Sequence, residues 1–112
     1  MDFPRECKLT KTDEYSSVFA FRRTRRGNHF KLHFRPNELG RARIGIVVAK
    51  KLVRRASQRN LIKRIIRERF RKMQTQLPAV DLVVRLHGQI TGATRKALNQ
   101  DIICLFETLI RQ

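Results

Sequence analysis

The sequence predicts an α+β fold, a single-domain sandwich in which helices pack against a mixed sheet. Three observations indicate it. Some segments alternate apolar and polar residues, as strands do, and others repeat apolar residues with helical spacing. The chain has 112 residues, 41% of them hydrophobic, which is enough for one modest core. The expected order is helix, strand, strand, helix, strand, helix, with space for a further short strand near the N-terminus.

The first helix is expected over residues 12–22. Thr12 is its candidate N-cap, and two acids, Asp13 and Glu14, follow in the first turn, where the helix dipole favours them. After a basic, glycine-containing stretch, residues 29–35 alternate strictly and predict a half-buried strand. Its apolar face consists of Phe30, Leu32 and Phe34. Its polar face consists of His29, Lys31, His33 and Arg35.

A turn over residues 36–40 leads to a second strand, expected over residues 43–49. One face of this strand consists of Ile44, Ile46 and Val48. The other face is shallow and consists of Gly45, Val47 and Ala49. A basic connector, residues 50–55, precedes a long helix over residues 57–76, for which Ser57 is a candidate cap.

A mostly buried strand is expected over residues 80–86, and a last amphipathic helix over residues 93–111. The inward side of that helix consists of Leu98, Ile102, Leu105, Phe106, Leu109 and Ile110. Cys104 falls within this apolar pattern and is expected in the core. Cys7 and Cys104 stand far apart without a CxxC spacing, which favours reduced thiols in a cytoplasmic protein over a disulfide.

Charge dominates the composition. Lys and Arg number 26 against 9 Asp and Glu, so the formal net charge is +17, and a polyanionic partner would relieve the resulting repulsion. No run approaches the ~18 apolar residues of a membrane span, and the first residues lack the apolar stretch of a secretory signal. Nucleic acid is therefore favoured as the partner over an anionic membrane or an acidic protein.

The helix expected over residues 57–76 separates into two arcs at ~100° per residue. The apolar arc consists of Leu61, Ile62, Ile65, Ile66, Phe70 and Met73. The basic arc consists of Asn60, Lys63, Arg64, Arg67 and Arg71. On a helix face that is only solvated, acids usually alternate with the basic residues. A helix bound to lipid would bury its apolar arc in the membrane, but the core needs that arc. The basic arc is interpreted as a surface for phosphates, which arginine binds with forked hydrogen bonds. Arg69 interrupts the apolar arc and is expected to extend outward along its aliphatic stem.

Two adjoining segments carry a family resemblance. Residues 43–51 read Arg-Ile-Gly-Ile-Val-Val-Ala-Lys-Lys, and residues 54–68 read Arg-Arg-Ala-Ser-Gln-Arg-Asn-Leu-Ile-Lys-Arg-Ile-Ile-Arg-Glu. They resemble the signature of the bacterial ribonuclease P protein, an Arg-Asn-Arg box leading into Lys-Arg and Arg-Glu on a long helix. The matching residues are Arg59, Asn60, Lys63, Arg64 and Arg67. Leu61 departs from the pattern, because the third box residue is usually arginine, but the similarity extends across nearly the whole chain.

The resemblance implies a fold like the second domain of ribosomal protein S5, with a rare left-handed strand–helix–strand crossover. It also implies that a partner RNA, with Mg²⁺, performs the hydrolysis, while the protein has no catalytic residue, metal or cofactor of its own. The protein would bind this catalytic RNA and the 5′ leader of precursor tRNA, and assist endonucleolytic removal of the leader in the bacterial cytoplasm. The surface for the catalytic RNA would consist of Lys50, Lys51, Arg54, Arg55, Arg59, Asn60, Lys63, Arg64, Arg67 and Arg71.

A second surface is predicted around the first helix, where Tyr15 and Phe19 are i,i+4 neighbours with Arg22 on the same side. On the residues alone, these aromatics either belong to the core or line a groove in which bases stack beside cations. The resemblance implies the groove, a cleft between this helix and the sheet for the single-stranded leader. The residues assigned to it are Tyr15, Phe19, Arg22, Lys31, His33 and Arg35.

The sequence offers little for protein-based catalysis. Its nine acids show no paired arrangement, its three histidines lack zinc spacing, and no glycine-rich phosphate loop is present. An autonomous metal-dependent nuclease is therefore disfavoured, and so is a sequence-specific DNA binder, because an arginine-rich helix suits backbone contact more than base reading. A structural RNA binder of the ribosomal type remains the alternative. Residues 1–112 are interpreted as a single RNA-binding domain.

Overall fold

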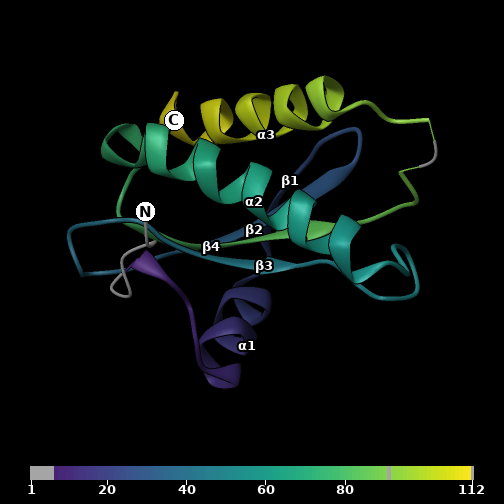
Figure 1. The fold of residues 1–112 in the computed structure, drawn as a ribbon. Coiled ribbons are helices and arrows are strands. Elements are labelled where there is room, and N and C mark those ends of the chain that lie inside the picture. The colour runs from purple at the N-terminus through teal and green to yellow at the C-terminus, as the bar shows by residue number, and fades with distance from the viewer. Residues whose placement is uncertain (1–6, 91, 112) are drawn as a thin grey trace.

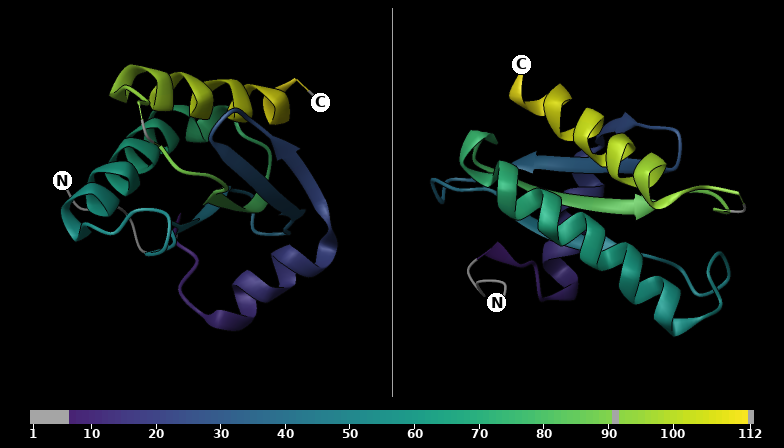
Figure 2. Two further views of the ribbon diagram at one scale, coloured as in Figure 1. Left: turned by 90° about the vertical axis from the view of Figure 1, so that its right-hand side faces the viewer. Right: turned by 45° about the horizontal axis from the view of Figure 1, so that its top comes forward.

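The structure is a computed structural model that describes residues 7–90 and 92–111. A four-stranded sheet forms the middle layer, with one helix on one face and two helices side by side on the other (Figures 1 and 2). The elements are α1 (Thr12–Phe21), β1 (Arg23–Arg26), β2 (Phe30–Pro36), β3 (Arg43–Val47), α2 (Ala56–Met73), the 3₁₀ helix η2 (Gln74–Gln76), β4 (Val80–Leu86) and α3 (Arg95–Ile110). The predicted α+β order is confirmed, and one strand that the sequence did not place, β1, follows α1. Near the N-terminus, Lys8 forms an isolated bridge with Ile44, not a strand.

The strands are arranged in the order β1-β2-β4-β3. The β1–β2 and β2–β4 pairs are antiparallel, whereas β3 and β4 are parallel and are joined through α2, so the sheet is mixed as predicted. This β3–α2–β4 connection is the crossover whose hand the family resemblance specifies. Strand β1 has no apolar residue, so its sequence shows no alternation of apolar and polar residues from which it could be predicted. It forms because it pairs with β2.

The core lies between the sheet and the pair α2 and α3. The sheet contributes the predicted apolar face of β2, and α2 contributes Ile62, Ile66 and Phe70, all nearly inaccessible to solvent. The rings of Phe70 and Phe106 meet edge to face with their centroids 6.3 Å apart. A smaller cluster under α1 consists of Leu9, Val18 and Val83, with Tyr15 and Val47 packed against it. Burial of these faces fixes which side of each helix points outward.

Two predicted helix caps are wrong by one or two residues. The N-cap of α1 is Lys11, not Thr12, and that of α2 is Arg55, not Ser57, which lies inside the helix. Neither residue gives a side-chain cap to its helix, so the preference for hydroxyl residues at this position misled the prediction. Helix α3 begins after Thr94, whose hydroxyl oxygen accepts a hydrogen bond from Ala97 N.

Both cysteines are unpaired, as expected, but the placement of Cys104 in the core is wrong. Cys104 is exposed, because the predicted inward residues of α3 occupy the opposite side of the helix and are buried or packed against the core. Cys7 is buried, and its Sγ accepts a hydrogen bond of 2.7 Å from Gln74 Nε2. Within residues 7–90 and 92–111, no helix combines the length and apolar character that crossing a membrane requires.

Candidate nucleic-acid interface

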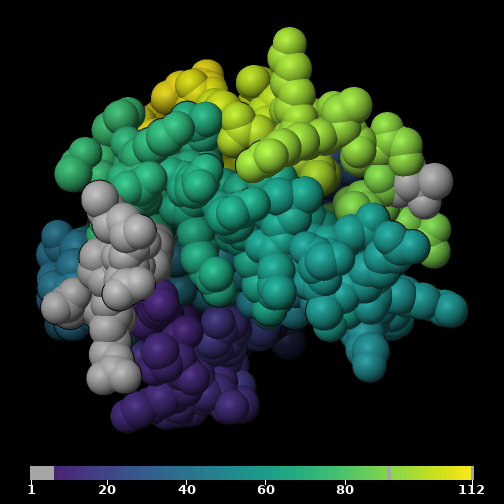
Figure 3. All heavy atoms as spheres, in the orientation of Figure 1, coloured from purple at the N-terminus to yellow at the C-terminus, as the bar shows by residue number. Residues whose placement is uncertain are grey.

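The outward face of α2 carries four cations and one amide in a strip that we call the basic ribbon. Its members are Asn60, Lys63, Arg64, Arg67 and Arg71. It exists because Ile62, Ile65, Ile66 and Phe70 are buried on the other side of the helix. Lys63 is half-buried and the other members are exposed. From Asn60 to Arg71 the ribbon extends about 16 Å at the rise of an α-helix, and α2 spans the middle of one face of the molecule (Figure 3).

Three cations of the ribbon, Lys63, Arg64 and Arg67, are not neutralised by any carboxylate among the described residues. In the described part of the chain, ion pairs join Arg43 to Glu14 and Asp81 and Arg111 to Glu107, and none involves Lys63, Arg64 or Arg67. These cations lie one helical turn or less apart, so they repel one another until an anion approaches. The predicted arc does face outward, and Lys63, Arg64 and Arg67 in it have no carboxylate partner among the described residues.

The connector before α2 adds further cations at the N-terminal end of the ribbon. Four of them are exposed: Lys50, Lys51, Arg54 and Arg55. Arg59 differs from the others, because its Nη1 donates to Val53 O at 2.9 Å and to Arg54 O at 2.8 Å. The guanidinium of Arg59 thus holds the connector against the first turn of α2, which gives this motif residue a structural role beside any contact with RNA.

Arg69, which interrupted the apolar arc, lies at the seam between α2 and α3. It is half-buried, and its Nε donates to Asn99 Oδ1 at 3.3 Å. Arg69 therefore leaves the apolar arc toward a polar partner on α3 and does not extend straight outward as expected.

The face of the sheet that α1 crosses is organised in rows by the strand register. In one row His33 stands between Thr24 and Val83, with Gly45 next to Val83. In the neighbouring row Lys31 stands between Arg26 and Arg85. Directly opposed residues of adjacent strands share a face, so each row is a line of neighbouring side chains.

The predicted cleft corresponds to this face of the sheet together with the adjoining side of α1. Tyr15 lies directly over β3. A Cβ atom added to Gly45 would come within 2.5 Å of the Tyr15 ring, so the ring rests on the glycine backbone. The Tyr15 hydroxyl donates to Leu9 O at 3.3 Å. The Tyr15 ring therefore packs on the face of β3 that was predicted to be shallow. Half-buried Tyr15 packs against the small cluster under α1 and also lines the predicted cleft.

Phe19 of α1 and His33 of β2 contact each other through their rings. Their ring centroids are 4.7 Å apart in a T-shaped arrangement, and Phe19 remains 37% exposed. His33 is buried, and its Nε2 has no hydrogen-bond partner among the described residues. Burial lowers the pKa of His33 to about 4, and the charges of Arg85 and Lys31 act in the same direction. His33 is thus neutral at pH 7, with a polar atom enclosed beneath an accessible aromatic ring.

Arg26, Lys31 and Arg85 form a cationic row beside these aromatic residues. Arg26 and Arg85 are exposed and Lys31 is half-buried. The sequence-based prediction missed Arg26 and Arg85. The signal for Arg85 was its place as the one basic residue of the strand 80–86, whereas Arg26 has no signal until the pairing of β1 with β2 is known.

Lys31, His33 and Arg35 share the face of β2 opposite Phe30, Leu32 and Phe34, as predicted. Arg35 is exposed at the other end of β2, where it lines a hollow with four acids: Asp13, Glu14, Glu38 and Asp81. This acidic neighbourhood separates Arg35 from the cationic row. Arg22 is exposed and ends α1 in a left-handed conformation, with φ of 62°.

An ion-pair network anchors α1 to the sheet. Arg43 on β3 donates from Nη1 to Glu14 Oε2 at 2.9 Å, and from Nε and Nη2 to the two oxygens of Asp81 at 2.8 and 2.7 Å. Asn37 Nδ2 also donates to Asp81 Oδ1 at 2.8 Å. The partners of Asp81 thus lie on another strand and in a turn. The network fixes the N-terminal half of α1, and with it the position of Tyr15.

Hydrogen bonds shift the pKa values in this network. The backbone N–H groups of Lys11 and Thr10, together with Arg43, lower the pKa of Glu14 to about 2. Burial raises the pKa of Asp81, but the hydrogen bonds from Arg43 and Asn37 outweigh it and leave the pKa below its usual value. Both carboxylates are therefore committed to the arginine, and no three His, Cys, Asp or Glu residues within the described ranges are grouped as metal ligands. Asp2 and Glu6 lie outside those ranges.

The two predicted surfaces meet at the β3 edge. A hollow of about 200 Å³ is lined by Tyr15 of the cleft and by Lys63 and Arg67 of the ribbon. Its other lining residues are Lys8, Leu9, Ile44 and Ile46. Fold and charge together define a small basic α+β protein suited to binding a long polyanion along one continuous surface.

The chain belongs to the ribonuclease P protein family, whose model, described as Ribonuclease P, matches residues 3–110. It is 64% identical over 102 residues to the ribonuclease P protein component of Azoarcus sp. (strain BH72), covering 91% of this chain and 85% of the relative. It is 59% identical over 98 residues to that of Aromatoleum aromaticum, covering 88% of this chain and 82% of the relative. The resemblance seen in residues 43–68 is confirmed.

Solved structures agree on the fold. The RNase P protein of Staphylococcus aureus superimposes with a TM-score of 0.84 at 24% identity, covering 91% of this chain and 94% of that one. The RNase P protein of Thermotoga maritima gives a TM-score of 0.79 at 24% identity, covering 90% and 96%. The same architecture is thus present at sequence identities too low to carry more than the fold.

Proposed function

We propose that this chain is the protein subunit of a bacterial ribonuclease P holoenzyme, and that it binds the catalytic RNA and the 5′ leader of precursor tRNA at the same time. In this role it assists endonucleolytic removal of the leader, which produces the mature 5′ end of the tRNA. The observation that carries the proposal is the outward face of α2, where Lys63, Arg64 and Arg67 have no carboxylate partner among the described residues.

The ribbon and the connector are assigned to the catalytic RNA. A row of four cations about 12 Å long on a rigid helix suits the backbone of a folded RNA, since it tracks phosphates without reading bases. Arginine predominates in this row, and its fork matches two phosphate oxygens at once. Arg59 supports the same contact indirectly, because it holds the connector and its cations in place.

The cleft is assigned to the single-stranded leader. Accessible Phe19 offers a ring on which a base stacks, and Arg26, Lys31 and Arg85 stand in a row beside it to follow the backbone. A mature tRNA has no leader and forfeits these contacts, so precursor binds more strongly than product. A structural RNA binder of the ribosomal type would need no accessible aromatic ring at this place.

Catalysis is assigned to the RNA subunit with Mg²⁺. The protein is assigned two other roles: it raises the affinity for precursor tRNA, and it screens the repulsion between the phosphates of the two RNAs. The carboxylates that could bind a metal ion support this division, because Glu14 and Asp81 are both bound to Arg43. We place the assembly in the bacterial cytoplasm, without a membrane or DNA partner. The unpaired thiols of Cys7 and Cys104 suit that compartment.

Reconstitution tests the proposal. The purified chain is added to a bacterial ribonuclease P RNA at a low Mg²⁺ concentration, where the RNA alone is slow, and 5′ processing of precursor tRNA is measured. We expect the chain to accelerate processing, and a variant with Lys63, Arg64 and Arg67 replaced by glutamine to lose most of the acceleration. Failure of the wild-type chain to stimulate processing would leave a structural RNA binder as the better account.

A further inference from the structure

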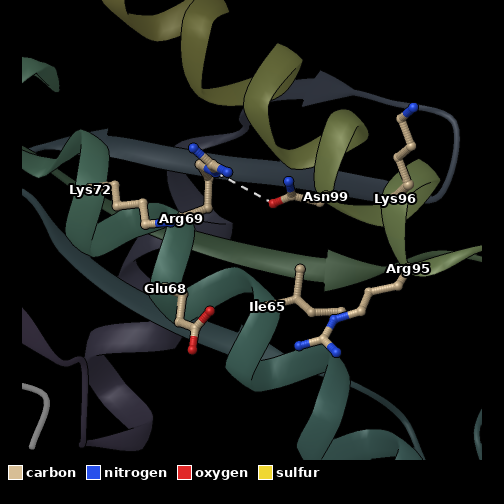
Figure 4. A pocket seen from close by; sticks show the side chains of 7 residues that line it. All are labelled: Ile65, Glu68, Arg69, Lys72, Arg95, Lys96 and Asn99. Carbon is tan, nitrogen blue, oxygen red and sulfur yellow. Dashed lines mark hydrogen bonds between the residues drawn. The ribbon is translucent and has the colours of Figure 1, made fainter. Parts of the chain in front are cut away.

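A groove between α2 and α3 carries cations that neither the ribbon nor the cleft includes. It has a volume of about 510 Å³ and is lined by Ile65, Glu68, Arg69, Lys72, Arg95, Lys96 and Asn99 (Figure 4). Arg95 reaches from α3 across Ile65 toward α2, Arg69 and Asn99 point toward each other, and Glu68 points away from α3 (Figure 4). Four cations and one carboxylate give this lining a net charge of +3.

The cations of the groove are available to a ligand. Arg69 is oriented by its hydrogen bond from Nε to Asn99, which leaves its two terminal nitrogens without a partner among the described residues. Lys72, Arg95 and Lys96 form no ion pair with any carboxylate in the described ranges. Glu68 forms no ion pair with any cation there. An uncompensated cluster of this kind raises the energy of the free protein, and a polyanion in the groove lowers it.

The groove is separate from the basic ribbon. On α2, Leu61 and Glu68 lie between the ribbon and the side that carries Ile65, Arg69 and Lys72, as the ~100° rotation per residue requires. Helix α2 therefore has cations along both margins of its exposed surface, one margin facing β3 and the other facing α3. Arg69 occupies a position of the apolar arc where a core residue would otherwise be expected. A role of its guanidinium in the groove explains this position.

We propose that this groove binds a second segment of the sugar-phosphate backbone of the catalytic RNA, so that the RNA contacts α2 on both margins. The inference rests on the proposed function. RNA is favoured over an acidic peptide because the groove adjoins the ribbon on the same helix, so one folded RNA can reach both. Arg69 and Arg95 offer forks to phosphate oxygens.

The test compares three variants in binding to a bacterial ribonuclease P RNA over a series of salt concentrations. The groove variant is Arg95→Gln/Lys96→Gln. The equal-charge control is Arg35→Gln/Arg111→Gln, which removes two exposed cations outside the groove, the ribbon and the cationic row. The ribbon variant is Lys63→Gln/Arg64→Gln/Arg67→Gln. Glutamine retains helix propensity, and thermal unfolding checks that each variant is folded.

We expect the groove variant to bind about tenfold more weakly than the control, with the salt slope reduced by about 1.5, since each lost phosphate contact removes ~0.7–0.9. Footprinting should show that the groove variant loses protection at RNA nucleotides different from those lost with the ribbon variant. The swap Arg95→Lys/Lys96→Arg keeps the charge and should restore most of the affinity.

The outcomes separate the two proposals. If the groove variant matches the control while the ribbon variant binds weakly, the groove inference is overturned and the proposed function stands. If the ribbon variant also binds as tightly as the wild type, the proposed function itself fails. Loss of protection at the same nucleotides in both variants would likewise contradict a second backbone segment.

Discussion

The ribbon on α2 and the cleft beneath α1 are both cationic, but they are assembled in different ways. The ribbon comes from one helix, and its orientation follows from burial of the opposite side of that helix. The cleft takes residues from α1 and all four strands, which strand pairing and the Arg43 network bring together. A surface on one element is therefore readable from periodicity, whereas a surface built across elements depends on contacts distant in sequence.

The largest expected effect comes from removing the packing that orients the ribbon. Phe70→Ala should lower the free energy of unfolding by about 3–5 kcal/mol, because Phe70 is fully buried against Phe106 and the deletion leaves a cavity. Denaturant unfolding measures the loss. Leu39→Ala is the control: Leu39 is 48% exposed, so its truncation should change stability by less than about 0.5 kcal/mol. Equal losses would mean that α2 is not held by this core.

The next effect tests the anchor of the cleft. Arg43→Met should destabilise the protein by about 2–4 kcal/mol, since it leaves Asp81 buried without its cation. Adding Asp81→Asn to Arg43→Met should recover part of this loss, because the stranded charge is removed as well. A double variant as unstable as the sum of both single variants would show that the two groups act independently.

Acid should destabilise the protein in two steps. His33 has a folded pKa of about 4 against an ordinary value of 6.5, so between these values the unfolded chain binds a proton that the folded protein does not, and stability falls as pH falls. This step is worth about 3 kcal/mol at most. Glu14, with its pKa lowered from 4.5 to about 2, adds a second loss as pH falls below 4.5.

Unfolding measured from pH 7 to pH 3 checks both steps. His33→Gln should remove the first step and leave the second. An unchanged slope between pH 6.5 and 4 in this variant would show that another group is responsible.

The smallest expected effect distinguishes the cleft from the core. Phe19→Ala should weaken binding of leader-bearing tRNA to the holoenzyme by about 1–3 kcal/mol, the worth of one stacked base, and spare mature tRNA. Phe21→Ala is the matched control, because Phe21 is also exposed on α1 but faces Arg23 instead of His33. Equal losses for precursor and mature tRNA would place Phe19 among residues that only support the fold.

Much of the architecture could be predicted from local patterns. The alternation of residues 29–35 and the two arcs of residues 57–76 correctly gave the buried faces of β2 and α2. The missed features depend on distant partners. Asp101 is a buried acid in α3 whose carboxylate accepts hydrogen bonds from the backbone N–H groups of Asn28, His29 and Phe30, more than seventy residues away. Nothing in the spacing around Asp101 marks that role.

The candidate site shows the same division. The ribbon residues were found because helical periodicity places them together, and Tyr15 and Phe19 because they are i,i+4 neighbours. Arg85 was missed, because its place beside Lys31 depends on the pairing of β4 with β2. The acids near Arg35 come from other elements, so the strand pattern could not reveal them. Alternation assigns a residue to a face of a sheet, but not to a position along that face.

The salt dependence of RNA binding tests most directly whether the outward cations of α2 meet phosphates. The dissociation constant for a bacterial ribonuclease P RNA is measured from low to high salt for the wild-type chain and for Lys63→Gln/Arg64→Gln/Arg67→Gln. Three lost phosphate contacts should reduce the slope of log affinity against log salt by about 2–3. An unchanged slope, with the variant folded, would contradict the account.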